Sequence, residues 1–187
     1  MWEIKTPEPV KLICGVLASD QDCLQSALVS MSEQLGPFDL QSEVWPFTQT
    51  TYYRKDMGPH ILRRFVAFSE LNSPGALAKI KHRTNALEQE LSQTLHHAYP
   101  RPVNLDPGYI EPSKLVLAST KNFSHRLYIG EDIYAEVTLV VDRGEWSLMR
   151  YTYPDYHQEC YWAFFESVRT RLIEQLKSNR EARHPVD

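Results

Sequence analysis

Apolar residues recur along this chain with two periods, one typical of strands and one typical of helices. Residues 10–17 form an almost continuous apolar run, which predicts a buried strand. A helix is predicted to follow, with Asp20 or Asp22 as its N-cap and Gly36 before Pro37 as its stop. The apolar face of this helix comprises Leu24, Ala27, Leu28, Met31 and Leu35.

Two strands and a second, longer helix come next. Residues 39–47 alternate weakly and end at Pro46, which suggests an edge or terminal strand, and residues 61–68 carry a second apolar run. These two strands could be neighbours in one sheet. Ser73 and Pro74 are suited to begin a helix, and apolar residues then mark one helical face as far as Leu95. The other faces are predicted to be mostly solvated and carry Lys79, Lys81, His82, Arg83, Glu88 and Glu90.

The second half of the chain predicts strands separated by turns, closed by a helix. Pro107 and Gly108 lie in Asp106-Pro107-Gly108-Tyr109, which fits a β-turn. Strands are expected at 114–118, 126–129 and 133–141, and residues 130–132 should close a hairpin between the last two. The amphipathic segment 159–177 predicts a final helix.

This order of elements predicts an α+β fold, with a mainly antiparallel sheet and helices packed on one face. The first half is compatible with a split β-α-β, ferredoxin-like arrangement. One domain is expected over residues 1–178, and the charged tail 179–187 is expected to be disordered.

Composition and charge exclude several classes of protein. A formal net charge of −4, with both signs mixed along the chain, makes nucleic acid an unlikely partner. No apolar run approaches the length that crosses a membrane. The three cysteines lack the number and spacing of a disulfide framework or a zinc knuckle, so we expect reduced thiols in a cytoplasmic protein. A homo-oligomer is compatible with the sequence.

Polar and ionisable side chains interrupt the predicted strands between residues 101 and 139. Because buried, unpaired charge is costly, these groups are expected to meet one another or a ligand. Ser119, Thr120, Lys121 and Arg126 offer hydroxyl donors and cations that could hold a phosphate or carboxylate. The alternative is a capped loop with an ordinary surface lysine. No phosphate-binding loop of the GxxxxGK[ST] type is present.

Three residues of this region are candidates for acid or base chemistry. Alternation along residues 134–139 places Glu136 on a polar strand face, and if Arg126 and Tyr128 lie across the hairpin on that face, Glu136 is expected to meet Arg126. Glu136 is then either half of a structural ion pair or a carboxylate oriented for proton transfer. His125 could act as acid or base, and turn capping explains Asp106 as well as function does.

Other groupings are weaker. His125, Asp106 and Glu136 could supply three ligands, but their wide spacing does not indicate a metal, so we predict no metal site and the sequence identifies no cofactor. Tyr53 and Arg63 belong to a second polar and aromatic group that could contribute to ligand binding.

Several long phrases together resemble DUF4416, a prokaryotic family of domains of unknown function. They are PFTQTTYYRKDMG, VNLDPGYI, KLVLASTKNFSHRLYIG, IYAEVTL and YPDY. The resemblance spans nearly the whole chain and implies very little about chemistry.

The sequence therefore favours binding of a small anionic ligand, such as a nucleotide or phosphorylated metabolite, in a polar cleft. Whether a reaction is catalysed stays open. The alternative is a non-catalytic protein-protein interaction module whose aromatic surface includes Tyr52, Tyr53 and Trp162.

Overall fold

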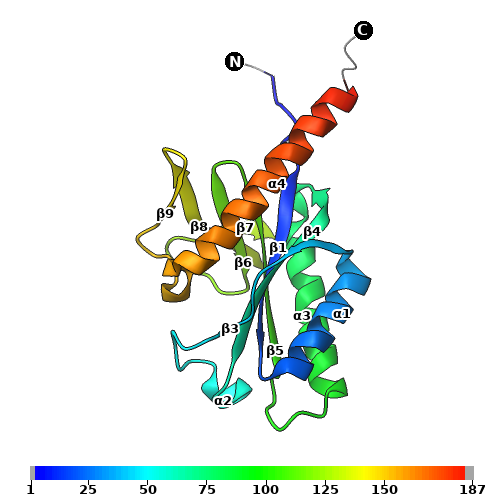
Figure 1. Ribbon diagram of the computed structural model, residues 1–187, viewed down its shortest axis with the longest axis vertical. Helices are drawn as coiled ribbons and strands as arrows, with labels where there is room; N and C mark the ends of the chain where they lie inside the picture. Colours follow the sequence, from blue (N-terminus) through cyan, green and yellow to red (C-terminus); the bar gives the residue numbers. More distant parts are fainter. Residues whose placement is uncertain (1–2, 184–187) are drawn as a thin grey trace.

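A nine-stranded, antiparallel sheet runs through the protein, which a computed structural model describes from residue 3 to residue 183 (Figure 1). The strands are β1 Val10–Ala18, β2 Phe38–Gln41, β3 Trp45–Pro46, β4 Leu62–Asn72, β5 Val103–Glu111, β6 Lys114–Ser119, β7 Leu127–Gly130, β8 Ile133–Asp142 and β9 Glu145–Leu148. Their order is β2-β4-β1-β5-β6-β8-β7, with β3 beside β4 and β9 beside β8. The helices are α1 Gln21–Leu35, α2 Arg54–Met57, α3 Leu77–Thr94 and α4 Glu159–Arg183, with 3-10 turns η1 Pro74–Ala76 and η2 Pro154–His157. The predicted α+β class is confirmed.

The first half has the predicted ferredoxin-like arrangement. Along the chain the elements run β1-α1-β2-β4-α3-β5, whereas in the sheet the strands lie in the order β2-β4-β1-β5. Each neighbouring pair is antiparallel, and β4 lies between β1 and β2 in the sheet. This is the split β-α-β topology. Strands β6 to β9 extend the sheet beyond β5.

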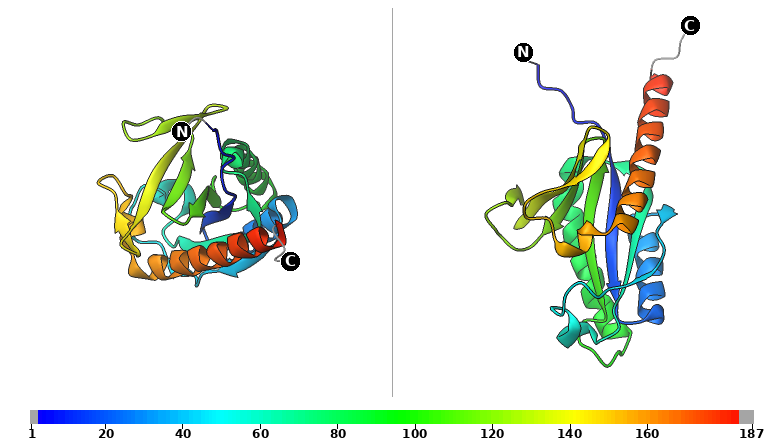
Figure 2. Two further views of the ribbon diagram at one scale, coloured as in Figure 1. Left: turned by 90° about the horizontal axis from the view of Figure 1, so that it is seen from above. Right: turned by 60° about the vertical axis from the view of Figure 1, so that its left-hand side comes forward.

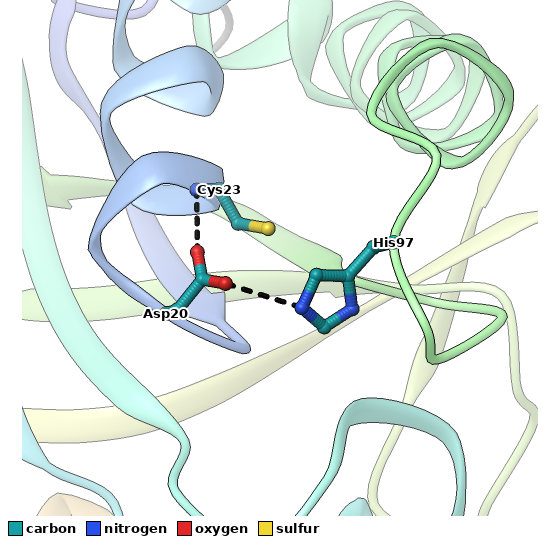
Figure 3. Close-up of side chains that lie close together, drawn as sticks. All are labelled: Asp20, Cys23 and His97. Atoms are coloured by element: carbon teal, nitrogen blue, oxygen red, sulfur yellow. Dashed lines mark hydrogen bonds and ion pairs between the residues drawn. The ribbon is translucent and has the colours of Figure 1, made fainter.

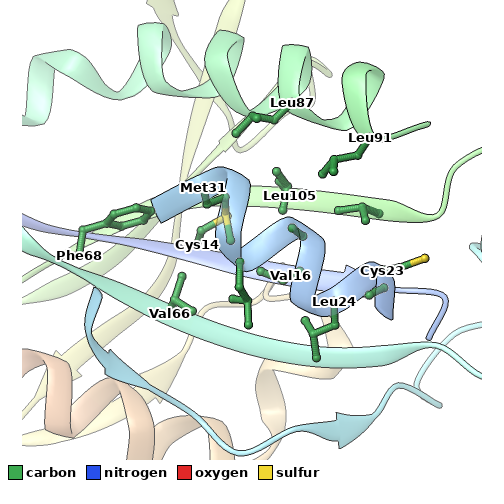
Figure 4. Packing of buried hydrophobic residues seen from close by; sticks show 14 of the residues in the cluster. Cys14, Val16, Cys23, Leu24, Met31, Val66, Phe68, Leu87, Leu91 and Leu105 are labelled. Carbon is green, nitrogen blue, oxygen red and sulfur yellow. The ribbon is translucent and has the colours of Figure 1, made fainter. Parts of the chain in front are cut away.

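Helices α1 and α3 lie side by side on one face of the sheet and enclose a core with β1, β4 and β5 (Figure 4). Asp20 caps α1 as predicted, because its Oδ1 accepts the Cys23 N–H at 2.8 Å. The stop is Gly36, whose φ of 105° favours glycine. The buried residues of this core include Cys14, Val16, Leu24, Met31, Val66, Phe68, Leu87, Leu91 and Leu105.

Helix α4 covers the opposite face, so the prediction that helices pack on one face is wrong. It buries Phe165, Val168 and Leu172 against Ile13 and Phe65, whose side chains point away from α1 and α3. The central strands β1, β4 and β5 contribute apolar residues to both faces of the sheet, and α1 and α3 cover only one of these faces. The described chain begins and ends at the same end of the molecule (Figure 1).

The last helix also corrects the prediction for the C-terminal tail. Helix α4 continues to Arg183, so residues 179–183 are helical and not disordered. Residues 184–187, the rest of the predicted tail, lie outside the described part of the chain.

The predicted turn at Asp106-Pro107-Gly108-Tyr109 is wrong, because these residues lie inside β5. Strand β6 pairs with β5 only from Gly108 onward, so Pro107, which has no N–H to donate, stands just before that ladder. Gly108 is needed for a close approach of strands: a Cβ there would lie 2.3 Å from the Val116 carbonyl oxygen.

Other local predictions fare differently. The β7–β8 hairpin is confirmed, and its two turn residues, Glu131 and Asp132, both have positive φ. The single strand predicted at 39–47 is divided into β2 and β3, because Ser42 Oγ between them accepts the Phe65 N–H at 2.9 Å. Within residues 3–183, no helix combines the length and apolar character that a membrane span requires.

Candidate functional site

A pocket of about 540 Å³ opens where β5 and β6 part. These strands are paired only from Gly108 to Glu111 on β5 and from Lys114 to Leu117 on β6. Beyond the paired section, polar residues from both strands face a common space that α3, β8 and the segments around residues 50 and 155 complete. The lining comprises Phe47, Gln49, Thr50, Tyr52, Tyr53, Arg63, Lys81, Asn85, Arg101, Asn104, Asp106, Leu117, Ala118, Ser119, Thr120, Lys121, Glu136, Tyr153, Pro154, Asp155 and Tyr156.

Asp106 lies on the β5 wall, held by neighbours on both sides. Asn104 donates to its Oδ2 at 2.7 Å, and Lys81 Nζ lies 3.8 Å from its Oδ1. Arg101 in turn donates to the Asn104 side-chain oxygen and to Glu88. The Asp106 side chain keeps 29% of its surface exposed, so this carboxylate is fixed in direction and accessible from the pocket.

Lys81 and Glu88 of α3 are buried, so the predicted solvation of this helix face is wrong for both. Lys81 Nζ donates to the Leu105 carbonyl at 2.8 Å, and Glu88 accepts the Leu105 N–H at 2.7 Å. They satisfy backbone groups of β5 that lie beside the gap between the strands. Burial raises the pKa of Glu88, although Arg101 and Lys81 oppose the shift.

Arg63 and Asp155 form a buried ion pair in the pocket lining. Arg63 Nη2 donates to Asp155 Oδ2 at 2.7 Å, and Arg63 is only 3% exposed. Its guanidinium carbon lies 5.1 Å from the ring centres of both Phe47 and Phe65. Burial raises the pKa of Asp155, and the Arg63 charge works against that rise.

Glu136 is the centre of a second ion pair, as predicted from the hairpin. Arg126 Nε donates to Glu136 Oε2 at 2.7 Å, and His125 Nε2 lies 3.1 Å from the same oxygen. The His125 ring stacks on Tyr151 with centres 4.1 Å apart. Glu136 is 2% exposed and Thr138, on the same face of β8, is fully buried, so this part of the strand face is not solvated. Arg126 and His125 support the pocket wall from behind.

Lys121 stands at the pocket with a different set of contacts. Its Nζ donates to the Tyr52 hydroxyl at 3.1 Å and lies 5.1 Å from the centre of that ring. Among the described residues no carboxylate lies within ion-pair distance of it, in contrast to Arg63 and Arg126. Ser119 Oγ accepts the Lys121 N–H at 3.1 Å, which fixes the loop after β6.

Seven of the ten predicted site residues line the pocket, and three do not. The seven are Tyr53, Arg63, Asp106, Ser119, Thr120, Lys121 and Glu136. His125 and Arg126 contact Glu136 on its far side, whereas Tyr128 is 60% exposed on β7, beside Tyr134. Sequence reasoning missed the contribution of α3. Its signal was present, since Lys81, Asn85 and Glu88 recur at the i, i+4, i+7 spacing of one helix face.

The fold and pocket define a protein with a ferredoxin-like core, an extended antiparallel sheet and a polar cavity at the point where two central strands part. The chain belongs to the family described as Domain of unknown function (DUF4416), whose model matches residues 8–172. No curated protein and no solved structure matched this chain.

Proposed function

We propose that the pocket binds a small anionic molecule, such as a nucleotide or a phosphorylated metabolite. The observation that carries the proposal is Lys121, a cation that lines the pocket together with Ser119 and Thr120 and that no described carboxylate neutralises. Ammonium and hydroxyl donors together suit a phosphate or carboxylate, because charge-assisted hydrogen bonds are the strong ones.

The charge balance of the lining supports an anion. Arg63, Lys81, Arg101 and Lys121 provide four cations against three carboxylates. Arg63 pairs with Asp155, Lys81 lies beside Asp106, and Arg101 pairs with Glu88, whereas Glu136 pairs with Arg126 outside the lining. Lys121 is the lining cation that no described carboxylate neutralises. The pocket therefore retains positive charge, although the protein as a whole carries a formal net charge of −4. An anionic ligand would gain from this local field.

The aromatic residues of the lining favour a ligand that carries a planar group in addition to its anionic group. Rings of Tyr52, Tyr53, Phe47, Tyr153 and Tyr156 supply apolar surface and edges. A volume of about 540 Å³ lies within the range of pockets for small molecules and cofactors. Asp106, held by Asn104 and partly exposed, could accept hydrogen bonds from amino or hydroxyl groups of such a ligand.

If the bound molecule is also converted, Asp106 is the best-placed acid or base of the three carboxylates. Its side chain faces the pocket and is the most exposed of them. Glu136 would position Arg126, and His125, which does not line the pocket, would act only through Glu136. Lys121 would neutralise negative charge on the ligand.

Thermal unfolding with defined probes tests the proposal. ATP, AMP, ribose 5-phosphate and inorganic phosphate should each be added to the wild type, Lys121→Ala and Lys79→Ala. At one hundred times its dissociation constant, a bound probe stabilises the folded state by about 2.7 kcal/mol, or roughly 5–11 °C for a chain of this size. Losing one charge-assisted hydrogen bond should weaken binding by about 10- to 100-fold in Lys121→Ala.

Lys79→Ala is the matched control, because Lys79 is an exposed lysine of α3 outside the pocket lining. It should respond to every probe as the wild type does. Equal stabilisation of Lys121→Ala and the wild type, or no stabilisation by any probe, would contradict the proposal.

A cytoplasmic setting belongs to the same proposal. The described cysteines Cys14, Cys23 and Cys160 are all free, and Cys160 is exposed. Exposed free thiols are typical of reducing compartments.

A protein-binding role is the second candidate, favoured by exposed apolar side chains around β7. Phe123, Leu127 and Tyr128 are 64%, 75% and 60% exposed. Both views of Figure 2 show this segment projecting from the body of the molecule. Strand β7 is also the end of the sheet order, with one free edge. Trp162, predicted to share such a surface, instead packs with the α4 core and donates to the Tyr156 carbonyl at 2.7 Å.

Sedimentation of the wild type and of Leu127→Lys tests this second role for a homo-oligomer. A wild-type dimer that becomes a monomer in Leu127→Lys would support self-association through β7. A monomeric wild type at all concentrations would remove the second copy as the partner.

A further inference from the structure

We propose that Asp20, Cys23 and His97 bind a divalent transition-metal ion of the zinc type. Asp20 and Cys23 belong to the start of α1, and His97 lies in the loop after α3 (Figure 3). One ligand atom from each residue lies within 4.8 Å of the other two. None of the three lines the pocket, so this site is separate from the proposed ligand site.

The distances are close to those that a tetrahedral ion needs. Asp20 Oδ2 lies 3.1 Å from His97 Nε2. Two oxygen or nitrogen ligands, each about 2.0–2.1 Å from a tetrahedral ion, are about 3.3 Å apart. Cys23 is almost fully buried, whereas the Asp20 side chain is 48% exposed. The ion would therefore rest on Cys23 with its fourth position open to water.

The ligand types select the metal. Thiolate, imidazole and carboxylate together suit zinc and its neighbours in the transition series, whereas magnesium and calcium prefer oxygen ligands alone. One thiolate and one carboxylate also neutralise a divalent cation, once the metal has displaced the Cys23 thiol proton into solvent. The same three residue types occur in nucleophilic triads, in which the histidine is hydrogen-bonded to the cysteine. Here His97 Nε2 is directed at Asp20, and no hydrogen bond joins His97 to Cys23 in the described structure, so the geometry does not favour a triad.

Metal binding requires one change in the loop after α3. His97 Nδ1 accepts the Tyr99 N–H at 3.2 Å, so in the metal-free protein the ring proton lies on Nε2 and is donated to Asp20. The ion takes the place of that proton. The ring proton then moves to Nδ1, and the Tyr99 N–H must turn to another acceptor. The signal of the Tyr99 amide should therefore shift on metal binding.

The site would fix the loop that leads to the pocket. His97 is four residues before Arg101, which lines the pocket and donates its backbone N–H to the Asp56 carbonyl at 3.0 Å. Ser19, just before Asp20, donates to the Pro102 carbonyl at 2.9 Å. An ion shared by α1 and this loop would tie the same two segments together a second time.

Cobalt substitution of the full-length protein tests the site. Chelator-treated protein is titrated with Co²⁺, because a thiolate ligand gives a sulfur-to-cobalt charge-transfer absorption that oxygen and nitrogen ligands do not. The wild type should bind one equivalent with this absorption, and Zn²⁺ should displace it. Cys23→Ser should lose the absorption. His97→Gln and Asp20→Asn should bind at least about 10-fold more weakly, since even loss of an outer-shell partner costs that much.

Cys160→Ser is the matched control, because Cys160 is the exposed cysteine and lies outside the cluster. It should bind Co²⁺ as the wild type does, and so should Lys121→Ala. Circular dichroism verifies that each variant is folded. Asp20→Asn can keep the helix cap, and His97 lies in a loop, so Asp20→Asn and His97→Gln should both fold. Their weaker Co²⁺ binding tests the site if Cys23→Ser does not fold. Absence of the absorption in the wild type, or its loss in Cys160→Ser but not in Cys23→Ser, overturns the proposal.

Discussion

Replacing Asp155 by alanine should destabilise the protein by about 3–5 kcal/mol, because it leaves the Arg63 charge buried without a counter-ion. The two side chains are 11% and 3% exposed, and their charged atoms are 2.7 Å apart. Nε and Nη1 of Arg63 have no hydrogen-bond partner among the described residues, so Asp155 is its main compensation. Phe47 and Phe65 offer only their ring faces.

Urea unfolding followed by circular dichroism measures the effect. For a chain of 187 residues, the same loss corresponds to a fall in melting temperature of roughly 6–20 °C. The double variant Arg63→Met/Asp155→Ala should regain part of the lost stability, because an apolar side chain needs no counter-ion in this position.

Glu181→Ala is the control, because it removes one partner of an ion pair that is exposed to water. Lys177 and Glu181 lie 3.9 Å apart on α4 and are 77% and 67% exposed, so the loss should stay below about 1 kcal/mol. If Asp155→Ala also changes the free energy of unfolding by less than about 1 kcal/mol, the guanidinium must reach water through the pocket. The interpretation of a buried, mutually dependent pair would then be wrong.

Two further predictions concern β5 and its neighbours. Gly108→Ala should cost about 1–3 kcal/mol of unfolding free energy, because the new Cβ would lie 2.3 Å from the Val116 carbonyl oxygen. Gly75→Ala should cost less, because a Cβ there has its nearest contact at 3.6 Å. Urea unfolding compares the two variants, and equal losses would contradict the close approach of strands. Burial raises the pKa of Glu88 above its ordinary value of 4.5, so the stability that Glu88 contributes is present below about pH 4.5 and is lost as pH rises through the raised value. The free energy of unfolding of the wild type relative to Glu88→Gln should therefore fall in urea titrations as pH rises above about 4.5, and a rise instead would reverse the assigned direction.

The period of the apolar residues was enough to predict most helices and strands of this protein. Which residues of a helix are buried depends on their spacing along the chain, so the apolar face of α1 from Leu24 to Met31 could be recognised from the sequence. The cap at Asp20 and the β7–β8 hairpin are also local features of the sequence. The pairing of Glu136 with Arg126 followed from the same hairpin, because residues opposite each other on two adjacent strands meet.

What tertiary structure alone decided is where the strands part and which distant residues come together. Pro107 and Gly108 have the composition of a turn, but they lie inside β5, next to the point at which β6 leaves it. That gap leaves the Leu105 carbonyl of β5 free to accept a hydrogen bond from buried Lys81, and it creates the pocket. Asp20 and His97, which are 77 residues apart in sequence, meet because α1 and α3 pack on the same face of the sheet. Local spacing carries no information about such contacts, since they depend on how whole elements pack.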